Sequence, residues 1–168
     1  MKKMVWVLAV MVLLCGCVNT AEPVFETVLD DMDIPVVAEP EAVHVWLPET
    51  AAAQTAVDGG SCYTWDTCEL RVQTLAGGDI QATLERLTGM SAKQLTVMEY
   101  KRGDLKMYQT VWSMTGEEGI TLGRCLVADD GAYHYCISLL SPENVDVQQE
   151  YAQICASLTL GEEEDYGK

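Results

Sequence analysis

The fold of this chain is most constrained by four alternating segments in its second half, each separated from the next by a short turn. The segments cover residues 95–100, 105–114, 120–128 and 132–140. Apolar and polar residues alternate within them, as expected of strands that bury one face. Each intervening turn contains glycine, which permits the left-handed backbone that tight hairpins need. The spacing therefore predicts a four-stranded antiparallel meander.

A short amphipathic helix is predicted before the meander. Ile80, Leu84 and Leu87 recur at helical spacing, so they would share one face. Asp79 precedes them as an N-cap, and Gly89 follows as a C-terminal stop.

A second helix is predicted after the meander. Ser141, Pro142 and Glu143 form a start signal: a capping hydroxyl, a proline at the first helical position and an acid near the positive helix end. The apolar stripe of this helix would consist of Val147, Tyr151, Ile154 and Leu158.

Two further strands are expected nearer the N-terminus, at residues 43–47 and 70–75, with a loop at residues 51–60 between them. The order of strand, strand, helix, four strands and helix predicts an α+β fold, in which two helices pack on an antiparallel sheet. A chain of 168 residues accommodates one such domain, which we place at residues 42–160. Residues 161–168 are interpreted as a solvated acidic tail.

The N-terminus has the organisation of an export signal. Lys2 and Lys3 precede an apolar run at residues 4–14, and this run is too short to span a bilayer. The sequence at residues 14–17 resembles the lipobox of bacterial lipoproteins, in which the last residue is the modified cysteine. The alternatives are an ordinary secretory signal and a short core helix.

Cys17 is the predicted site of lipidation, and residues 1–16 are the predicted signal peptide. Cys15 is a poorer candidate, because Leu14 would then occupy the cleavage position, where the peptidase needs a small side chain. Acyl chains on Cys17 would hold the domain on the extracytoplasmic face of the cell membrane.

Residues 17–41 are interpreted as the lipidated cysteine and an acidic tether. Prolines and acids keep such a segment extended, with a reach of about 25–30 Å. Its apolar residues within 25–34 leave a second interpretation open, in which this part docks on the domain or forms one helical turn.

The charge of the chain excludes one class of partner. Acidic residues outnumber basic ones 26 to 10, which gives a formal net charge of −16. This field repels nucleic-acid phosphates and anionic lipid head groups. We therefore expect no nucleic-acid partner, and membrane attachment only through the lipid on Cys17.

The five cysteines after Cys17 predict disulfide candidates, with one thiol left over because the number is odd. If Asp130 and Gly131 form a two-residue hairpin turn, Cys125 lies directly opposite Cys136, and an oxidising exterior would bond them. A bulge would shift this register by one residue.

The other two candidates, Cys62 and Cys68, bracket a seven-residue segment that a bridge would close. The remaining Cys155 lies beside the stripe of the last helix, where a small buried apolar side chain fits.

No catalytic or metal centre is predicted. His134 would share a strand-pair face with Cys125 and Cys136, but a fourth zinc ligand and the usual spacing are missing. A phosphate-binding glycine loop, a nucleophile elbow, a zinc-protease motif and a Ser/His/Asp pattern are all missing from the sequence. Core packing is the favoured role of Trp46, Trp65 and Trp112, with a ligand groove as the alternative.

Two resemblances extend this interpretation. The first resemblance rests on six segments, at residues 73–75, 78–79, 83–84, 88–89, 130–136 and 155–160. They resemble uncharacterised lipoproteins of clostridial and related bacteria, over about residues 24–160. More remotely, the element order is similar to the PsbP-like fold, named for an extrinsic photosystem II subunit and shared by a Ran-binding nuclear import factor. Proteins of that fold differ widely in their partners, so the similarity carries no functional residue over.

The sequence thus predicts a membrane-anchored, extracytoplasmic lipoprotein with one α+β domain of PsbP-like layered arrangement. We expect this domain to be a non-catalytic binding or accessory module of the cell envelope that needs no cofactor and has an envelope protein as its partner. The alternative is a small-ligand or cation-binding lipoprotein that serves a transporter, motivated by the acidic surface and the aromatic residues.

Overall fold

The computed structural model describes residues 39–55, 60–117 and 119–161. The predicted signal peptide, Cys17, most of the predicted tether and the acidic tail after Gly161 lie outside the described residues. They therefore stay predictions.

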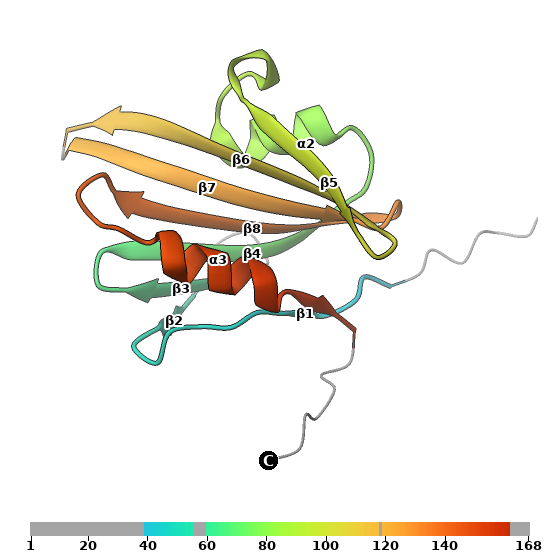
Figure 1. The fold of residues 1–168 in the computed structure, drawn as a ribbon, viewed down its shortest axis with the longest axis horizontal. Coiled ribbons are helices and arrows are strands. Elements are labelled where there is room, and N and C mark those ends of the chain that lie inside the picture. Colours follow the sequence, from blue (N-terminus) through green and yellow to red (C-terminus); the bar gives the residue numbers. More distant parts are fainter. Residues whose placement is uncertain (1–38, 56–59, 118, 162–168) are drawn as a thin grey trace, which may run out of the picture. The chain divides into compact units, whose positions relative to one another are not determined.

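A seven-stranded antiparallel sheet forms the centre of the domain, with the strand order β2-β3-β4-β8-β7-β6-β5 (Figure 1). Its strands are β2 (Ala52–Gln54), β3 (Ser61–Trp65), β4 (Cys68–Ala76), β5 (Val97–Arg102), β6 (Leu105–Gly116), β7 (Gly119–Asp129) and β8 (Tyr133–Pro142). The predicted meander is confirmed as β5 to β8, and β8 joins it to the N-terminal strands through β4.

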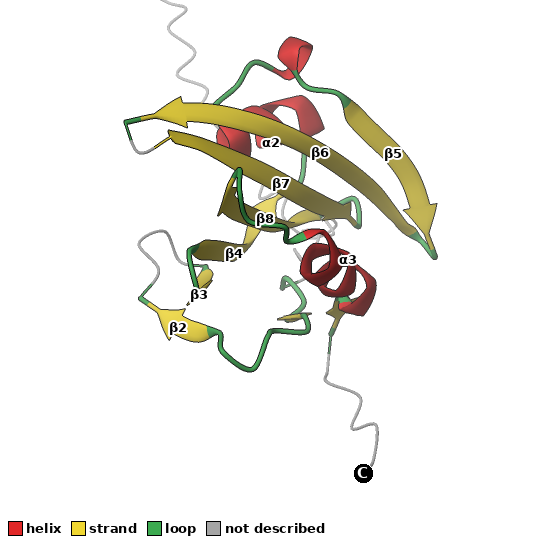
Figure 2. Ribbon diagram, turned by 60° about the vertical axis from the view of Figure 1, so that its left-hand side comes forward, coloured by secondary structure: helices red, strands yellow, loops and turns green. Residues whose placement is uncertain are grey.

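Two helices cover opposite faces of this sheet, as Figures 1 and 2 show for α2 (Ile80–Thr88) and α3 (Gln148–Ser157). On the α3 face, Ile154 and Leu158 belong to the same core as Leu70, Ile137 and Leu139. On the α2 face, the second core consists of Leu84, Tyr108, Trp112, Cys125, Val127 and Cys136. The predicted α+β class with two packed helices is confirmed.

Helix α2 begins and ends where its sequence predicts. Asp79 Oδ1 accepts a hydrogen bond from the Gln81 backbone N–H at 2.9 Å, as an N-cap does. Gly89 has φ 69°, the left-handed conformation that glycine adopts at a helix end. The 3₁₀ turn η1 (Ala92–Gln94) then leads into β5.

The predicted start of the second helix at residues 141–143 is wrong. Ser141 and Pro142 continue β8, where they pair with Leu122 and Thr121 of β7, and α3 begins only at Gln148. Ladder pairing across the sheet therefore overrides the local start signal, and the proline is tolerated because it is the last residue of the strand. The predicted apolar stripe is confirmed, since all four of its residues contact the α3-face core.

The N-terminal strands also differ from the expectation. Only β1 (Val43–His44) forms within the predicted strand at 43–47, and it pairs with β9 (Thr159–Leu160) in a separate two-stranded sheet. After His44 the backbone turns to α3 instead, where the Trp46 N–H donates to Ser157 Oγ at 2.7 Å. The predicted loop at 51–60 contains β2, and β3 was not predicted.

The two ends of the domain are tied together. The Gly161 N–H donates to the Ala42 carbonyl at 3.0 Å, and the Glu41 N–H donates to Tyr135 Oη at 3.2 Å. His44 Nε2 donates to the Gly161 carbonyl at 2.8 Å. Contacts of the domain thus reach one residue beyond each of the predicted boundaries, 42 and 160.

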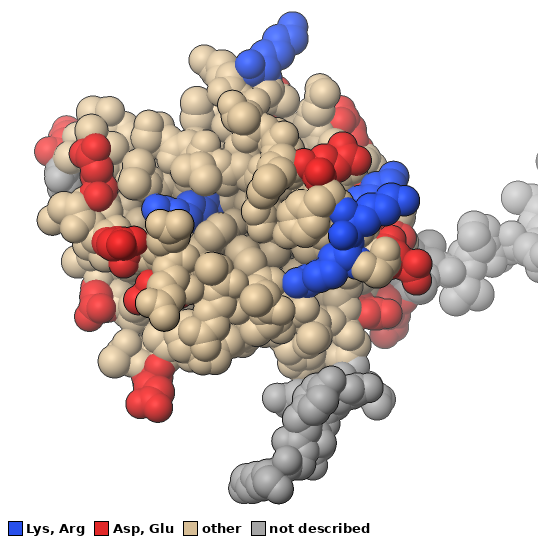
Figure 3. Space-filling model, viewed as in Figure 1, with Lys and Arg blue, Asp and Glu red and all other residues tan. Residues whose placement is uncertain are grey.

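Figure 3 shows the face that carries α3, where acidic and basic side chains lie mainly around the margin and the centre is largely uncharged. The strand register places Met98, Val111 and Ile120 on this face, and all three are exposed.

Candidate functional site

A cavity of about 310 Å³ lies between α2 and the sheet. The lining side chains used below are Cys62, Arg71, Arg86, Leu87, Trp112, Ser138 and Leu140. They come from strands β3, β4, β6 and β8 and from helix α2. This volume falls at the lower end of the range for small-molecule sites, so the cavity is a candidate ligand site.

The strand register explains why these residues meet. Cys62 pairs with Arg71, Arg71 pairs with Ser138, and Ser138 pairs with Cys125, so one row crosses four strands. Side chains opposite one another in paired strands point to the same face of a sheet. Since Cys125 belongs to the α2-side core, the whole row faces α2.

Trp112 forms a wall of the cavity because its partner across the strands is glycine. Trp112 pairs with Gly123, and a Cβ added at Gly123 would lie 2.2 Å from Trp112 Cε2. The indole therefore lies directly against the β7 backbone, a close approach that any larger residue at position 123 would prevent. The ring is 5% exposed.

Two residues that line the cavity each carry a buried polar atom that has no hydrogen-bond partner within the described residues. These atoms are Nε1 of Trp112 and Oγ of Ser138, on side chains that are 5% and 7% exposed. An unsatisfied buried polar group costs about 1–3 kcal/mol, and such groups are rare in native proteins. Of the four such atoms in the described part of the chain, these two belong to residues that line the cavity, whereas His134 Nε2 and Tyr151 Oη do not.

The cavity is also basic within an acidic chain. Its lining includes Arg71 and Arg86 but, in the part of the chain that the structure describes, no Asp or Glu. Arg71 Nε donates to Glu69 Oε1 in a solvent-exposed pair. Among the described residues, Arg86 has no ion pair. The cavity therefore favours negative charge.

The sequence points to only one of these residues as a candidate ligand contact. Trp112 was named as an aromatic that lines either a groove or the core, and it borders both. Trp46 and Trp65 instead pack in the α3-face core, so they have the packing role that was favoured for them. Arg71, Arg86 and Ser138 were missed, because only the pairing of β4 with β8 brings Arg71 beside Ser138.

The expected pairing of Cys125 with Cys136 is wrong. Cys125 lies opposite Ser138, and Cys136 lies opposite Val127, so the two thiols are diagonal neighbours on the α2 face. Diagonal residues are about 7–8 Å apart, too far for a disulfide without backbone movement, and both thiols are free. Burial raises the pKa of each thiol to about 12.

The turn between β7 and β8 is the physical reason for this register. Asp129 pairs with His134, which leaves a four-residue loop in place of the expected two-residue turn. Asp130 Oδ1 accepts the Ala132 and Tyr133 N–H groups at 2.8 and 2.6 Å, and these bonds hold the longer loop. Burial raises the pKa of Asp130, but these hydrogen bonds and one from Tyr135 outweigh it and hold the pKa below its usual value.

The expected bridge between Cys62 and Cys68 does not fit the structure either. Cys62 pairs with Arg71 and faces α2, whereas Cys68 pairs with Trp65 and lies in the α3-face core. Both thiols are free and point to opposite faces of the hairpin. Cys155 is buried as expected, and burial raises the pKa of its thiol.

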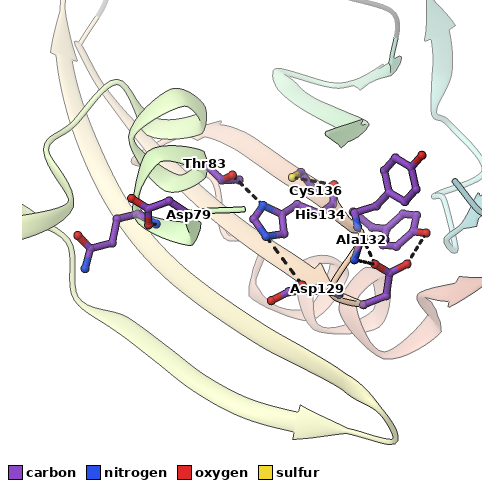
Figure 4. Close-up of polar contacts among 11 residues, drawn as sticks. Asp79, Thr83, Asp129, Ala132, His134 and Cys136 are labelled. Atoms are coloured by element: carbon purple, nitrogen blue, oxygen red, sulfur yellow. Dashed lines mark hydrogen bonds and ion pairs between the residues drawn. The ribbon is translucent and has the colours of Figure 1, made fainter. Parts of the chain in front are cut away.

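A second polar group of residues surrounds His134, as Figure 4 shows. Thr83 Oγ1 and His134 Nδ1 are 2.8 Å apart, and His134 Nε2 lies 3.9 Å from Asp129 Oδ1. The order of a hydroxyl, an imidazole and a carboxylate resembles a nucleophile relay, which the sequence did not reveal. However, His134 is fully buried, Thr83 is 8% exposed, and neither lines the cavity. We therefore assign this group the role of joining α2 to β8.

His134, Cys125 and Cys136 do face the same side of the sheet, as expected. In the part of the chain that the structure describes, no three His, Cys, Asp or Glu side chains are arranged to hold a metal ion.

Comparisons with known proteins concern the fold alone. No family model matches the chain, and no curated protein matches it. A solved protein of Bacteroides thetaiotaomicron VPI-5482 aligns with a TM-score of 0.53 and 13% identity, over 72% of this chain and 46% of that chain. The chain thus spans less than half the length of that protein.

A second solved structure, LpqN of Mycobacterium tuberculosis, is described as involved in cell envelope biogenesis. It aligns with a TM-score of 0.49 and 11% identity, over 74% of this chain and 87% of LpqN.

Within residues 39–55, 60–117 and 119–161, no helix has the length and apolar character needed to cross a membrane.

Proposed function

We propose that this chain is a lipid-anchored extracytoplasmic protein of the cell envelope, and that its domain is a non-catalytic module that binds a small ligand beside α2. The N-terminal lipobox pattern supports the anchor. The observation that carries the binding function is the cavity whose wall contains two unpaired buried polar atoms.

The chemistry of the cavity supports binding rather than catalysis. Among the described residues its lining includes the hydroxyls of Thr55, Ser61 and Ser138 and one half-buried thiol, Cys62, but no histidine, aspartate or glutamate that would activate any of them. Measurable turnover of a small molecule by the purified protein would contradict the non-catalytic assignment.

The anchor is tested by replacing the predicted lipidated cysteine. In a bacterial host, Cys17→Ser should abolish the acyl modification and release the protein from the membrane fraction, whereas Cys15→Ser should leave both unchanged. Intact-protein mass spectrometry and membrane fractionation measure these outcomes. An unmodified Cys17 in the wild-type protein would overturn the anchor.

The binding site is tested by filling the cavity from α2. Leu87→Trp enlarges a half-buried lining residue, and Gln81→Trp adds the same indole at an exposed position of the same helix. In a melting-temperature screen of small molecules, compounds that stabilise the wild type should also stabilise the Gln81→Trp variant, but not the Leu87→Trp variant. Compounds that stabilise all three proteins equally would place the ligand site elsewhere.

The same screen separates this function from docking of an envelope protein, the other function expected from the sequence. Filling the cavity should abolish small-ligand binding, whereas a partner protein docked elsewhere on the surface would still bind the Leu87→Trp variant. Co-purification of one partner with both tryptophan variants, together with no small-molecule binding, would favour the docking function.

A further inference from the structure

We infer that the cavity beside α2 binds a small organic anion with an apolar or aromatic body, its acid group held by Arg71 and Arg86. This inference rests on the proposed function and specifies the ligand class of the same site.

The first step is the charge of the lining. In the described part of the cavity wall two side chains are charged, and both are arginines. Of these two, Arg86 has no ion pair within the described residues. Guanidinium groups donate hydrogen bonds and accept none, and their planar geometry matches carboxylate and phosphate. A cationic ligand would meet Arg86, which has no ion pair within the described residues, and Arg71, whose charge Glu69 partly compensates. This site therefore does not support the cation-binding alternative raised by the sequence.

The second step is the hydrogen-bonding character of the unpaired groups. Trp112 Nε1 is a donor only, and Ser138 Oγ both donates and accepts. Ser138 is directly opposite Arg71 in the β4–β8 pairing, so its hydroxyl and the guanidinium belong to one part of the wall. A ligand that carries several acceptor oxygens would satisfy both unpaired groups, whereas a ligand rich in donors would leave the indole N–H unpaired.

The third step is the apolar remainder of the wall. Leu87 from α2, Leu140 from β8 and the indole of Trp112 supply it. The volume of about 310 Å³ exceeds the roughly 150 Å³ of an apolar cavity that binds benzene. One aromatic ring or a short aliphatic chain therefore fits together with its acid group.

The ligand class is tested with four water-soluble probes on the full lipidated chain in lipid nanodiscs, with protein-free nanodiscs as background. Benzoate is the anion with an apolar body, benzamide its neutral counterpart, benzylamine the cation, and inorganic phosphate the anion without the body. Ligand-observed NMR titrations give each dissociation constant. We expect benzoate to bind at least tenfold more tightly than each of the other three, and its binding to weaken with added salt.

Two sets of variants make the test specific. Arg86→Gln should weaken benzoate binding about tenfold without weakening benzamide binding. Lys93→Gln removes the same charge at an exposed position outside the lining and should change neither.

Ser138→Ala removes an unpaired polar atom and keeps most of the side chain. It should raise the melting temperature of the protein without probe and weaken benzoate binding several-fold, because the deleted group is unsatisfied until a ligand pairs with it. Residues with a purely structural role would not give this opposite pair of effects.

The outcomes separate the two proposals. If benzamide or benzylamine binds as tightly as benzoate, and Leu87→Trp abolishes this binding, the ligand class is wrong and the proposed site stands. If none of the four probes binds, both the ligand class and the binding site are overturned.

Discussion

Gly123 leaves room for the indole of Trp112, which lines the cavity. A side chain at this position would collide with the indole of Trp112, since its Cβ would lie 2.2 Å from Cε2. Gly123→Ala should therefore displace the ring and reduce the free energy of unfolding by about 1–3 kcal/mol, as measured by urea titration.

Gly116→Ala is the matched control for that variant. Gly116 also lies in a strand of the same sheet, and a Cβ there would meet only the Gly119 carbonyl oxygen, at 3.9 Å. We expect a change within about 0.5 kcal/mol for this variant. Equal destabilisation by both substitutions would show that the contact with Trp112 is not the cause.

Cys125 and Cys136 make the domain sensitive to alkali. Burial raises the pKa of each thiol from its usual value of 9.0 to about 12, so the folded state retains protons that the unfolded state releases. The stabilisation is fully present below pH 9 and is lost as the pH rises toward 12. Over this window each thiol should lower the free energy of unfolding by about 1.4 kcal/mol per pH unit.

Urea titrations at several pH values measure this slope. The double variant Cys125→Ala, Cys136→Ala should unfold with a shallower dependence on pH between 9 and 12 than the wild type. An unchanged slope would mean that other groups dominate the alkaline transition.

At the level of elements, Thr83 joins α2 to β8. Its hydroxyl lies 2.8 Å from His134 Nδ1, and both side chains are buried. Thr83→Val keeps the shape of the side chain and leaves the imidazole nitrogen without this partner, so it should cost about 1–3 kcal/mol of stability. Thr83→Ser keeps the hydroxyl and should restore most of that loss in a urea titration. If the valine and serine variants are destabilised equally, the loss of stability would be due to altered packing rather than to loss of the hydroxyl.

Helix α3 depends on an arginine from another element at its C-terminal end. Arg102 of β5 donates from Nη1 to the Cys155 carbonyl at 2.9 Å and from Nη2 to the Leu158 carbonyl at 3.0 Å. Helix C-terminal carbonyls lack partners within the helix, and a cation is favoured there. Arg102→Met should therefore lower the unfolding free energy by roughly 1–3 kcal/mol.

The neighbouring Lys101 provides the control for Arg102. Its side chain is exposed and makes no hydrogen bond or ion pair within the described residues. Lys101→Met should leave the chemical denaturation midpoint almost unchanged. A similar loss for both variants would attribute the effect to charge in general rather than to the two carbonyl contacts.

The elements that the sequence predicted correctly are those specified by local signals. Glycine turns and alternating residues defined β5 to β8, and Asp79 and Gly89 defined α2. The start of α3 was wrong because the local signal at Ser141 and Pro142 competes with pairing to β7, a contact between residues about 20 positions apart in the sequence. The predicted cysteine register is wrong because Asp130 Oδ1 accepts hydrogen bonds from the Ala132 and Tyr133 N–H groups and so stabilises a longer loop. The pattern of turn residues alone does not reveal these bonds.

For the whole molecule, the fold class was more accessible than the candidate site. The α+β class follows from the order of elements, whereas the cavity combines residues of α2 with residues of four strands. Arg71 and Ser138 become neighbours only through the pairing of β4 with β8. Neither periodicity nor a motif identifies such a contact, so the site became visible only in the assembled sheet.

The joined ends of the domain predict where the chain can be shortened. A chain of residues 39–161 keeps β1, β9 and the bonds of Glu41 and Gly161 to Tyr135 and Ala42, so it should unfold cooperatively and close to the full-length midpoint. Starting at residue 48 instead removes Val43, Val45, Trp46 and Leu47, which pack on the α3-face core. Loss of these half-buried side chains should cost roughly 3–6 kcal/mol. Urea titrations of the two chains compare these values, and equal stability would show that β1 and the residues after it contribute nothing to the core.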